Sequence, residues 1–164
     1  MSLTFVLGGV RSGKSALAVR LASEWAGPVT FIATGEAGDD EMAERIRRHR
    51  QERPAEWTTV EEPVELASAL ENAPSDAAVV VDCLSLWVAN VLDDDVDVRS
   101  ERAVVAAKTR ARAIVVSNEV GLGVVPVSEL GRRYRDVLGR VNAQWAAAAD
   151  EALFVVAGKA LRLQ

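Results

Sequence analysis

Residues 8–15, read as GGVRSGKS, form the segment whose residue types and spacing point most directly to chemistry. They fit the pattern G-x-x-x-x-G-K-[ST], with Gly8, Gly13, Lys14 and Ser15 at its defined positions. Glycines let the backbone wrap an anion, so that successive N–H groups and the start of a following helix point at a phosphate. Lys14 adds a mobile positive charge, and the Ser15 hydroxyl is a ligand for Mg²⁺. The segment therefore predicts a nucleotide-phosphate site.

The neighbouring sequence favours this interpretation of the glycine-rich segment. The apolar run LTFVL at 3–7 precedes it as a predicted strand, and an amphipathic helical pattern at 14–25 follows it. The alternative is a glycine turn that joins a strand to a helix and carries a lysine by chance. Motif, strand and helix agree, which favours the phosphate site.

Polar side chains also end two other apolar runs. Asp82 closes the run at 78–83 and is expected to be the metal-side carboxylate of a phosphate-binding enzyme. The alternative role for Asp82 is a cap for the helical pattern at 84–92; the strand-then-acid form favours the nucleotide site. The serine, asparagine and glutamate at 117–119 are either ligands at a sheet edge or a capped turn, and both alternatives stay open.

His49 is the only histidine of the chain and lies among arginines. The surrounding pattern predicts a helix over 39–53, capped by Asp39 or Asp40 and stopped by Pro54. One side of that helix carries Met42, Ile46, His49, Arg50 and Arg53. Guanidinium groups there suit a phosphate chain, and nearby positive charge favours a neutral imidazole that acts as nucleophile or base. A structural histidine on a half-apolar face is the alternative, and composition does not decide between them.

The remaining pattern alternates strands with helices. Strands are predicted at 3–7, 29–34, 78–83, 113–120 and 152–158, each apolar without alternation and hence buried on both faces. Helices are predicted at 14–25, 39–53, 63–72, 84–92, 99–111 and 128–150, with a small additional strand at 56–63. This order indicates a single α/β domain over residues 1–164, with a mostly parallel sheet and helices on both faces.

Charge and composition exclude several classes of protein. With a net charge of −5, general attraction to nucleic acid is not expected. The single cysteine, Cys83, forms no internal disulfide and suits a reducing cytoplasm. We expect no membrane insertion, because no apolar run approaches the ~20 residues that a spanning helix needs. The acidic patch at 93–98 is predicted to be an exposed loop, with a metal site as the alternative.

The sequence resembles a known family over essentially its whole length. The segments that carry the likeness are GGVRSGKS, FIATGEAGDDEMAERIRRHRQERPAEWTTVEEP, VVVDCLSLWVANVL, VVSNEVGLGVVP and LGRRYRDVLGRVNAQWAAAADEALFVVAG. They are similar to the bifunctional adenosylcobinamide kinase/adenosylcobinamide-phosphate guanylyltransferases of cobalamin biosynthesis. The glycine-rich loop is shared with many P-loop NTPases, whereas the second and fourth segments are more specific to this family.

The resemblance implies two reactions. The γ-phosphoryl group of ATP or GTP passes to a hydroxyl of adenosylcobinamide, and GMP from GTP then passes to the resulting phosphate through a covalent histidine intermediate. By its position, that histidine is His49, with Lys14 as the other catalytic residue and Mg²⁺ held by Ser15 and Asp82. The nucleotide contacts implied are Gly8, Gly9, Val10, Arg11, Ser12, Gly13, Lys14, Ser15, Ala33, Thr34, Gly35, Arg50, Gln51, Glu52, Arg53, Glu61 and Asp82. The family also implies a homotrimer.

Two segments depart from the family pattern. The linker DDDVDVRSERAVVAAKTRAR is short and unusually charged, and the end VAGKALRLQ differs from the usual apolar G-x-P ending. Two rival functions stay open from the sequence: a monofunctional P-loop kinase of small molecules, and a regulatory protein that binds nucleotide without transferring a group.

Overall fold

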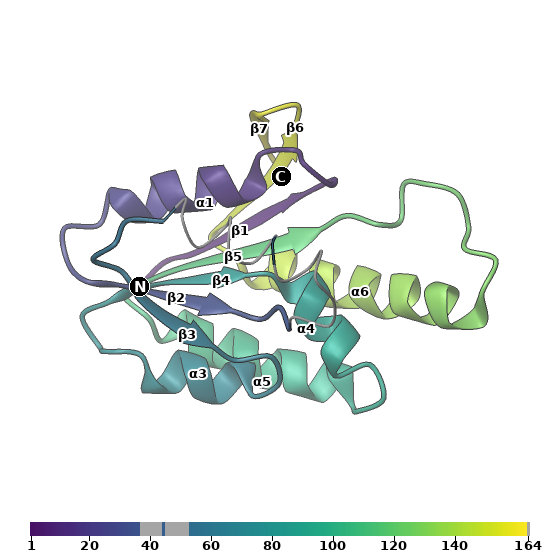
Figure 1. The fold of residues 1–164 in the computed structure, drawn as a ribbon, viewed down its shortest axis with the longest axis horizontal. Helices are drawn as coiled ribbons and strands as arrows, with labels where there is room; N and C mark the ends of the chain where they lie inside the picture. Colours follow the sequence, from purple (N-terminus) through teal and green to yellow (C-terminus); the bar gives the residue numbers. More distant parts are fainter. Residues whose placement is uncertain (37–43, 45–52, 164) are drawn as a thin grey trace.

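The computed structural model of the protein describes residues 1–36, 44 and 53–163. Within these residues a 7-stranded sheet has the order β3-β2-β4-β5-β1-β6-β7 (Figure 1). The strands are β1 (Leu3–Gly8), β2 (Val29–Ala33), β3 (Thr58–Glu61), β4 (Ala78–Asp82), β5 (Arg112–Asn118), β6 (Glu151–Val156) and β7 (Lys159–Arg162). Neighbours pair in parallel, except for the antiparallel pair β6–β7. The prediction of a mostly parallel α/β sheet is confirmed.

Helices lie on both faces of this sheet, also as predicted (Figure 1). They are α1 (Lys14–Ser23), α3 (Leu66–Asn72), α4 (Leu84–Asn90), α5 (Val96–Lys108) and α6 (Glu129–Ala148). Adjacent strand residues enter different cores because strand side chains alternate: Phe5 packs in the core with α3 to α6, and Val6 in the core with α1. The predicted helix at 39–53 lies outside the described residues apart from Glu44 and Arg53.

The strand order determines which strand ends are neighbours. The central strands β1, β4 and β5 are almost entirely buried, as their unbroken apolar runs predict. β5 lies between β1, which leads into the glycine-rich loop, and β4, which ends in Asp82. All three strands run in the same direction, so their carboxyl ends meet at one edge of the sheet.

The acidic patch at 93–98 is only partly a loop, so that prediction is corrected. Helix α5 begins at Val96, because the Asp95 carboxylate accepts a hydrogen bond from the Val98 N–H at 3.3 Å and caps the helix. The Val96 side chain is buried. Asp93 and Asp97 form ion pairs with arginines of α6, at 3.0 Å and 3.1 Å. No cluster of metal-ligating side chains occurs within the part of the chain that the structure describes.

The last predicted strand, at 152–158, is in fact the first half of a hairpin. β6 ends at Val156, and Ala157 and Gly158 take positive φ angles of 49° and 75° before β7 pairs back antiparallel. Two central residues with positive φ form a type I′ turn, for which Asn-Gly or Asp-Gly is the usual sequence signal. Alanine at the first turn position conceals that signal, and the sequence therefore predicts one strand where two are present.

Candidate functional site

The glycine-rich loop leaves the end of β1 and enters α1, as the motif predicts. Gly13 has φ 101° and Arg11 has φ 54°, so the loop depends on left-handed backbone at both residues. At Gly8 an added Cβ would lie 2.4 Å from the Val155 carbonyl oxygen of β6, which leaves no room for a side chain. The loop conformation thus requires the first and second glycines of the motif.

Lys14 lies across this loop. Its side chain is 7% exposed, and its ammonium group donates a hydrogen bond to the Gly9 carbonyl oxygen at 2.6 Å. The positive charge is therefore held next to the loop that precedes the first turn of α1. A helix N-terminus and a buried ammonium group at one place favour a bound anion.

Ser12 carries a buried hydroxyl inside the same loop. Among the residues that the structure describes, its Oγ has no hydrogen-bond partner. A buried hydroxyl without a partner is costly unless a ligand or water completes its bonding. This atom therefore suits a loop that is completed by a bound oxyanion.

Strand register brings the other predicted site residues to the same edge of the sheet. Ala33, the last residue of β2, is the register partner of Glu61 in β3 and of Asp82 in β4. On the other side of β5, Gly8 is the partner of Asn118. The loop and the ends of β2, β3, β4 and β5 therefore lie along one edge, although the sequence separates them widely.

Thr34 joins two of these strand ends. Its hydroxyl donates to the Cys83 carbonyl oxygen at 2.7 Å and accepts from the Cys83 N–H at 2.9 Å. The Asn90 side chain donates to the Thr34 carbonyl oxygen at 2.8 Å. Thr34 is fully buried, so these bonds satisfy backbone groups that water does not reach.

The structure excludes one of the two alternatives for Asp82, and its role at the nucleotide site stays a prediction. Helix α4 has Cys83 at its N-cap and no side-chain hydrogen bond caps it, so the prediction of Asp82 as a helix cap is excluded. Burial, and after it the negative charge of Asp82, raise the pKa of the Cys83 thiol to about 11. The positive charge of Lys14 lowers the pKa of the same thiol, so Lys14 and Asp82 both lie close enough to Cys83 to affect it. Cys83 itself is a neutral thiol at pH 7 and no nucleophile.

The polar residues at 117–119 make bonds within the protein. The Ser117 hydroxyl donates to the Asn142 side chain at 2.6 Å, and the Asn118 side chain donates to the Ser85 hydroxyl at 2.6 Å. The Glu119 N–H donates to the Gly8 carbonyl oxygen at 3.0 Å. The capped-turn alternative applies to Glu119, whose carboxylate accepts a hydrogen bond from the Gly121 N–H, whereas Ser117 bonds a side chain of α6. Asn118 and Glu119 also lie beside the glycine-rich loop.

Sequence reasoning missed the side chains that support this edge from α4 and α6. Three of these side chains bond residues that end a strand or follow it directly: Asn90 donates to the Thr34 carbonyl oxygen, Asn142 donates to the Asn118 carbonyl oxygen, and Ser85 accepts from the Asn118 side chain. The fourth, Tyr134, bonds the backbone of Ser85. The Tyr134 hydroxyl donates to the Ser85 carbonyl oxygen at 2.9 Å, and burial raises its pKa to about 12. Polar residues within helical patterns give no sequence signal of this role, because tertiary packing alone decides which strand they meet.

The segment around the lone histidine is only partly described. His49, Arg50, Gln51 and Glu52 lie outside the described residues. The Arg53 guanidinium lies over the Phe31 ring, 3.5 Å from its centroid, which is a cation–π contact on β2. Gly35 is half-buried and follows Thr34 beyond the end of β2. The predicted nucleotide contacts of these residues stay predictions.

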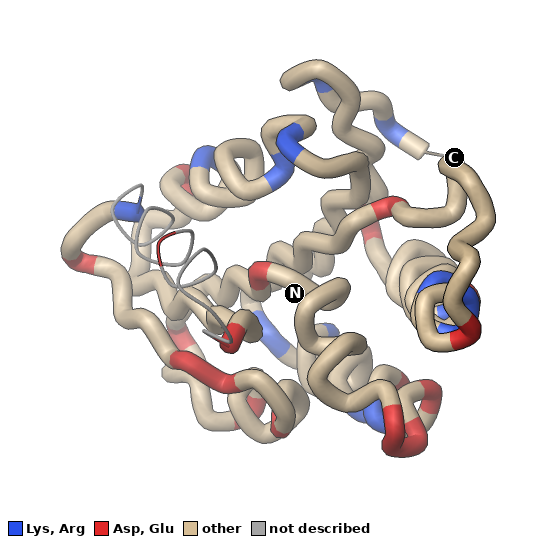
Figure 2. Tube along the Cα trace, turned by 45° about the vertical axis from the view of Figure 1, so that its right-hand side comes forward, with Lys and Arg blue, Asp and Glu red and all other residues tan. Residues whose placement is uncertain are grey.

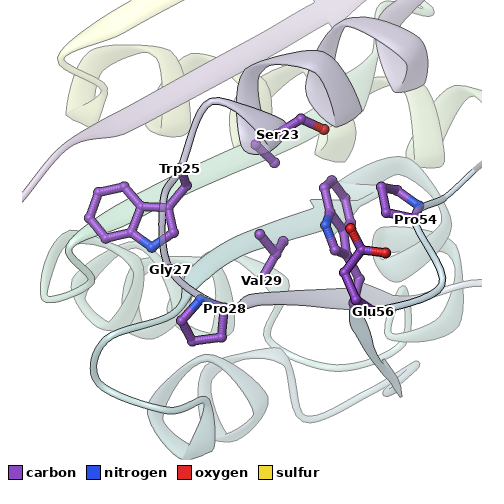
Figure 3. A pocket seen from close by; sticks show the side chains of 9 residues that line it. Ser23, Trp25, Gly27, Pro28, Val29, Pro54 and Glu56 are labelled. Carbon is purple, nitrogen blue, oxygen red and sulfur yellow. The ribbon is translucent and has the colours of Figure 1, made fainter.

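A pocket of about 160 Å³ lies elsewhere, between α1 and the start of β2 (Figure 3). Trp25, Pro28 and Trp57 are among the residues that line it. Val29, the first residue of β2, also lines it, so the pocket is at the amino end of that strand. The glycine-rich loop follows the carboxyl end of β1, and the pocket is therefore separate from the candidate site.

Two further sequence expectations concern charge and membranes. In the view of Figure 2, blue Lys and Arg segments and red Asp and Glu segments both occur along the described chain. The expectation of no role on nucleic acid rests on the net charge of −5 and stays a prediction. Among the described helices, none is both long and apolar enough to cross a bilayer.

The chain is similar to known proteins over nearly its whole length. The protein called "Bifunctional adenosylcobalamin biosynthesis protein CobP" from Pseudomonas aeruginosa is 46% identical over 97% of this chain and 95% of its own length. The protein called "Bifunctional adenosylcobalamin biosynthesis protein CobU" from Escherichia coli is 39% identical over 99% of each chain. Among solved structures, the flagellar accessory protein FlaH from Methanocaldococcus jannaschii matches with a TM-score of 0.59 at 14% identity, over 99% of this chain and 78% of its own. That likeness concerns the fold alone.

The family match spans nearly the whole chain. Residues 4–163 match the family described as "Cobinamide kinase / cobinamide phosphate guanyltransferase". The glycine-rich loop, the strand ends beside it and this match lead to one conclusion: the chain belongs to the cobinamide kinase/cobinamide phosphate guanylyltransferase family.

Proposed function

We propose that the loop at 8–15 binds the nucleoside triphosphate for both reactions of this family, and that in the second reaction His49 carries GMP from GTP to the phosphorylated cobinamide. The chain is an enzyme of cobalamin biosynthesis with kinase and guanylyltransferase roles. The assignment of individual residues to those roles is our proposal. The observation that carries it is the Lys14 ammonium group held over the loop at Gly9, with Lys14 and Asp82 both close enough to Cys83 to change the pKa of its thiol.

In the kinase reaction, a hydroxyl of adenosylcobinamide attacks the γ-phosphorus of ATP or GTP, the bond to the β-phosphate oxygen breaks, and the hydroxyl proton is released. Such a transfer needs positioning and charge neutralisation more than covalent help. The loop N–H groups and Lys14 bind the β- and γ-phosphate oxygens. The buried Ser12 hydroxyl supplies a further donor to the bound phosphates.

Ser15 and Asp82 are the donors that would hold Mg²⁺ with the nucleotide. A hydroxyl and a carboxylate fit this ion, because Mg²⁺ at nucleotide sites takes one or two protein oxygens and fills its shell with phosphates and water. Bound there, Mg²⁺ supplies positive charge to the phosphate oxygens. Ala33, Thr34, Gly35 and Glu61 are proposed to contact the nucleotide from the ends of β2 and β3, which is supported by their shared edge.

In the guanylyl reaction, a ring nitrogen of His49 attacks the α-phosphorus of GTP and pyrophosphate leaves. The phosphate of the first product then attacks the same phosphorus, the P–N bond breaks, and adenosylcobinamide-GDP forms while His49 regains its lone pair. Arg50 and Arg53 are proposed to neutralise the triphosphate, with Gln51 and Glu52 beside them. Splitting one displacement into two is a known benefit of covalent catalysis.

The test of this proposal is the intact mass of the protein after incubation with GTP and Mg²⁺, for wild type and His49→Asn. We expect a GMP adduct in wild type only, labile in acid and stable in base, as a phosphoramidate is. The kinase reaction, measured separately with ATP, stays active in His49→Asn. An adduct that persists in His49→Asn, or its absence from a wild type that binds GTP, would refute the covalent role.

Two rival functions give different results in the same experiments. A monofunctional kinase forms phosphorylated cobinamide but no adduct, and a regulatory binding protein forms neither. The cytoplasmic location is proposed from the single cysteine of the chain, and the homotrimer is carried over from the family resemblance. Light scattering after size exclusion tests the trimer, since the expected mass is three times the chain's 17.6 kDa.

A further inference from the structure

The C-terminal hairpin touches the glycine-rich loop directly. The Gly158 N–H, in the turn between β6 and β7, donates a hydrogen bond to the Ser12 carbonyl oxygen at 2.8 Å. A Cβ added at Gly13 would lie 3.4 Å from the Gly158 Cα. Figure 1 shows the tip of this hairpin beside the start of α1. Ser12 and Gly158 are therefore close in space although they are far apart in the sequence. The turn is thus a neighbour of the loop and not only the end of a sheet.

The geometry of the turn sets the direction of this N–H. Val156 and Lys159 are a pair in the β6–β7 ladder, so Ala157 and Gly158 form a two-residue turn. Their φ angles of 49° and 75° are those of type I′. Alanine in left-handed backbone is uncommon, and such residues persist where the surrounding structure determines them. The conformation of the turn is therefore specific and holds Gly158 at the loop.

Ser12 connects the turn to the part of the loop that would face a phosphate. Because a peptide unit is planar and trans, a Ser12 carbonyl oxygen that accepts from Gly158 directs the Gly13 N–H to the opposite side, away from the hairpin. The buried Ser12 hydroxyl has no partner among the described residues. One residue thus holds the hairpin with its carbonyl group and keeps a hydroxyl for a ligand.

We propose that the β6–β7 turn is a positioning element of the nucleotide site, with Gly158 as the residue that orients the Ser12–Gly13 peptide for phosphate binding. This inference rests on the proposed nucleotide role of the loop. It also assigns a function to the segment VAGKALRLQ, in which this chain departs from its family's usual ending. The prediction is a coupling between the C-terminal hairpin and nucleotide affinity.

The test compares two changes to the turn. Insertion of one glycine between Ala157 and Gly158 lengthens the turn and moves the Gly158 N–H, while the β6–β7 ladder stays paired. Ala157→Asn is the matched control, because Asn-Gly favours type I′ and keeps the donor in place. For both proteins, titration gives the Kd for Mg·GTP, thermal unfolding gives Tm, and kinase assays give KM and kcat.

We expect the insertion to raise the Kd and the nucleotide KM by about tenfold, the effect of a lost hydrogen bond and a rotated loop peptide. The kcat and Tm should change little, and Ala157→Asn should bind as wild type does. If the insertion destabilises the fold, Gly158→Ala, which strains the same position without a change in length, is expected to raise the Kd in the same direction.

The inference is overturned if the insertion variant is folded and its Kd lies within about twofold of wild type. An equal loss of affinity in Ala157→Asn would also contradict it, because that variant keeps the donor. A wild type that binds no Mg·GTP would refute the proposed nucleotide site itself, and this inference with it. The failure of the coupling alone leaves wild-type binding intact.

Discussion

The Thr34 hydroxyl and the Cys83 backbone form a reciprocal pair of hydrogen bonds, with the hydroxyl donating at 2.7 Å and accepting at 2.9 Å. This pair joins the end of β2 to the residue after Asp82. Both residues are buried, so the Cys83 N–H depends on this one side chain, whereas the Cys83 carbonyl oxygen also accepts from the Trp87 N–H at 3.2 Å. A single hydroxyl thereby connects two strand ends of the candidate site.

Thr34→Val is expected to destabilise the protein by about 1 to 3 kcal/mol, because it leaves the buried Cys83 N–H without a partner, while the Cys83 carbonyl oxygen keeps its bond from the Trp87 N–H. Thr34→Ser keeps the hydroxyl and is the control, with a loss of about 1 kcal/mol from the missing methyl group. Urea unfolding of the three proteins measures the difference. Equal stability of the Val and Ser variants would show that the hydroxyl pair contributes little.

Cys83 predicts a loss of stability at alkaline pH. Burial and the charge of Asp82 raise the thiol pKa from 9.0 to about 11 in the folded state. Between these values the unfolded chain releases its thiol proton and the folded chain retains it, so stability falls as pH rises from about 9 to about 11. The expected loss is about 2 to 3 kcal/mol over that interval. The free energy of unfolding of Cys83→Ala should fall by this much less than that of wild type between about pH 9 and about pH 11. Parallel pH profiles of the two proteins would contradict the prediction.

Asp82→Asn tests the metal-side role of the carboxylate with two independent measurements. The variant should need about tenfold more Mg²⁺ for half-maximal kinase activity, because Mg²⁺ prefers charged oxygen ligands. It should also lower the Cys83 pKa, since Asp82 raises it, and alkylation of the thiol against pH reports that shift. Asp76→Asn, an exposed carboxylate in a turn, is the control. An unchanged Mg²⁺ requirement beside a shifted thiol pKa would remove Asp82 from the metal site.

Asn142 is expected to stabilise the end of β5. Its side chain accepts from the Ser117 hydroxyl at 2.6 Å and donates to the Asn118 carbonyl oxygen at 3.0 Å. Asn142→Ala should cost about 2 to 3 kcal/mol, because both groups then lose their partner. In a double-mutant cycle with Ser117→Ala, we expect a coupling of about 1 kcal/mol. Additive losses would show that the two side chains act independently.

The fold was predictable where the residue pattern is unambiguous. Unbroken apolar runs identify β1, β2, β4 and β5, and the helical periods between them imply a parallel sheet. Predictions were wrong where a local contact overrides the pattern. Asp95 caps α5 inside an acidic run that reads as a loop, and Ala157 occupies a turn position for which the usual residues are Asn, Asp and Gly.

The sequence by itself determined the glycine-rich loop, because spacing along the chain is enough to specify a phosphate-binding turn between a strand and a helix. It also determined the family, since the likeness covers the chain from 4 to 163. Only the tertiary structure decided that β5 separates β1 from β4, that Thr34 holds Cys83, and that Gly158 meets Ser12. These relationships arise from strand order and packing across long sequence separations, which local residue preferences do not encode.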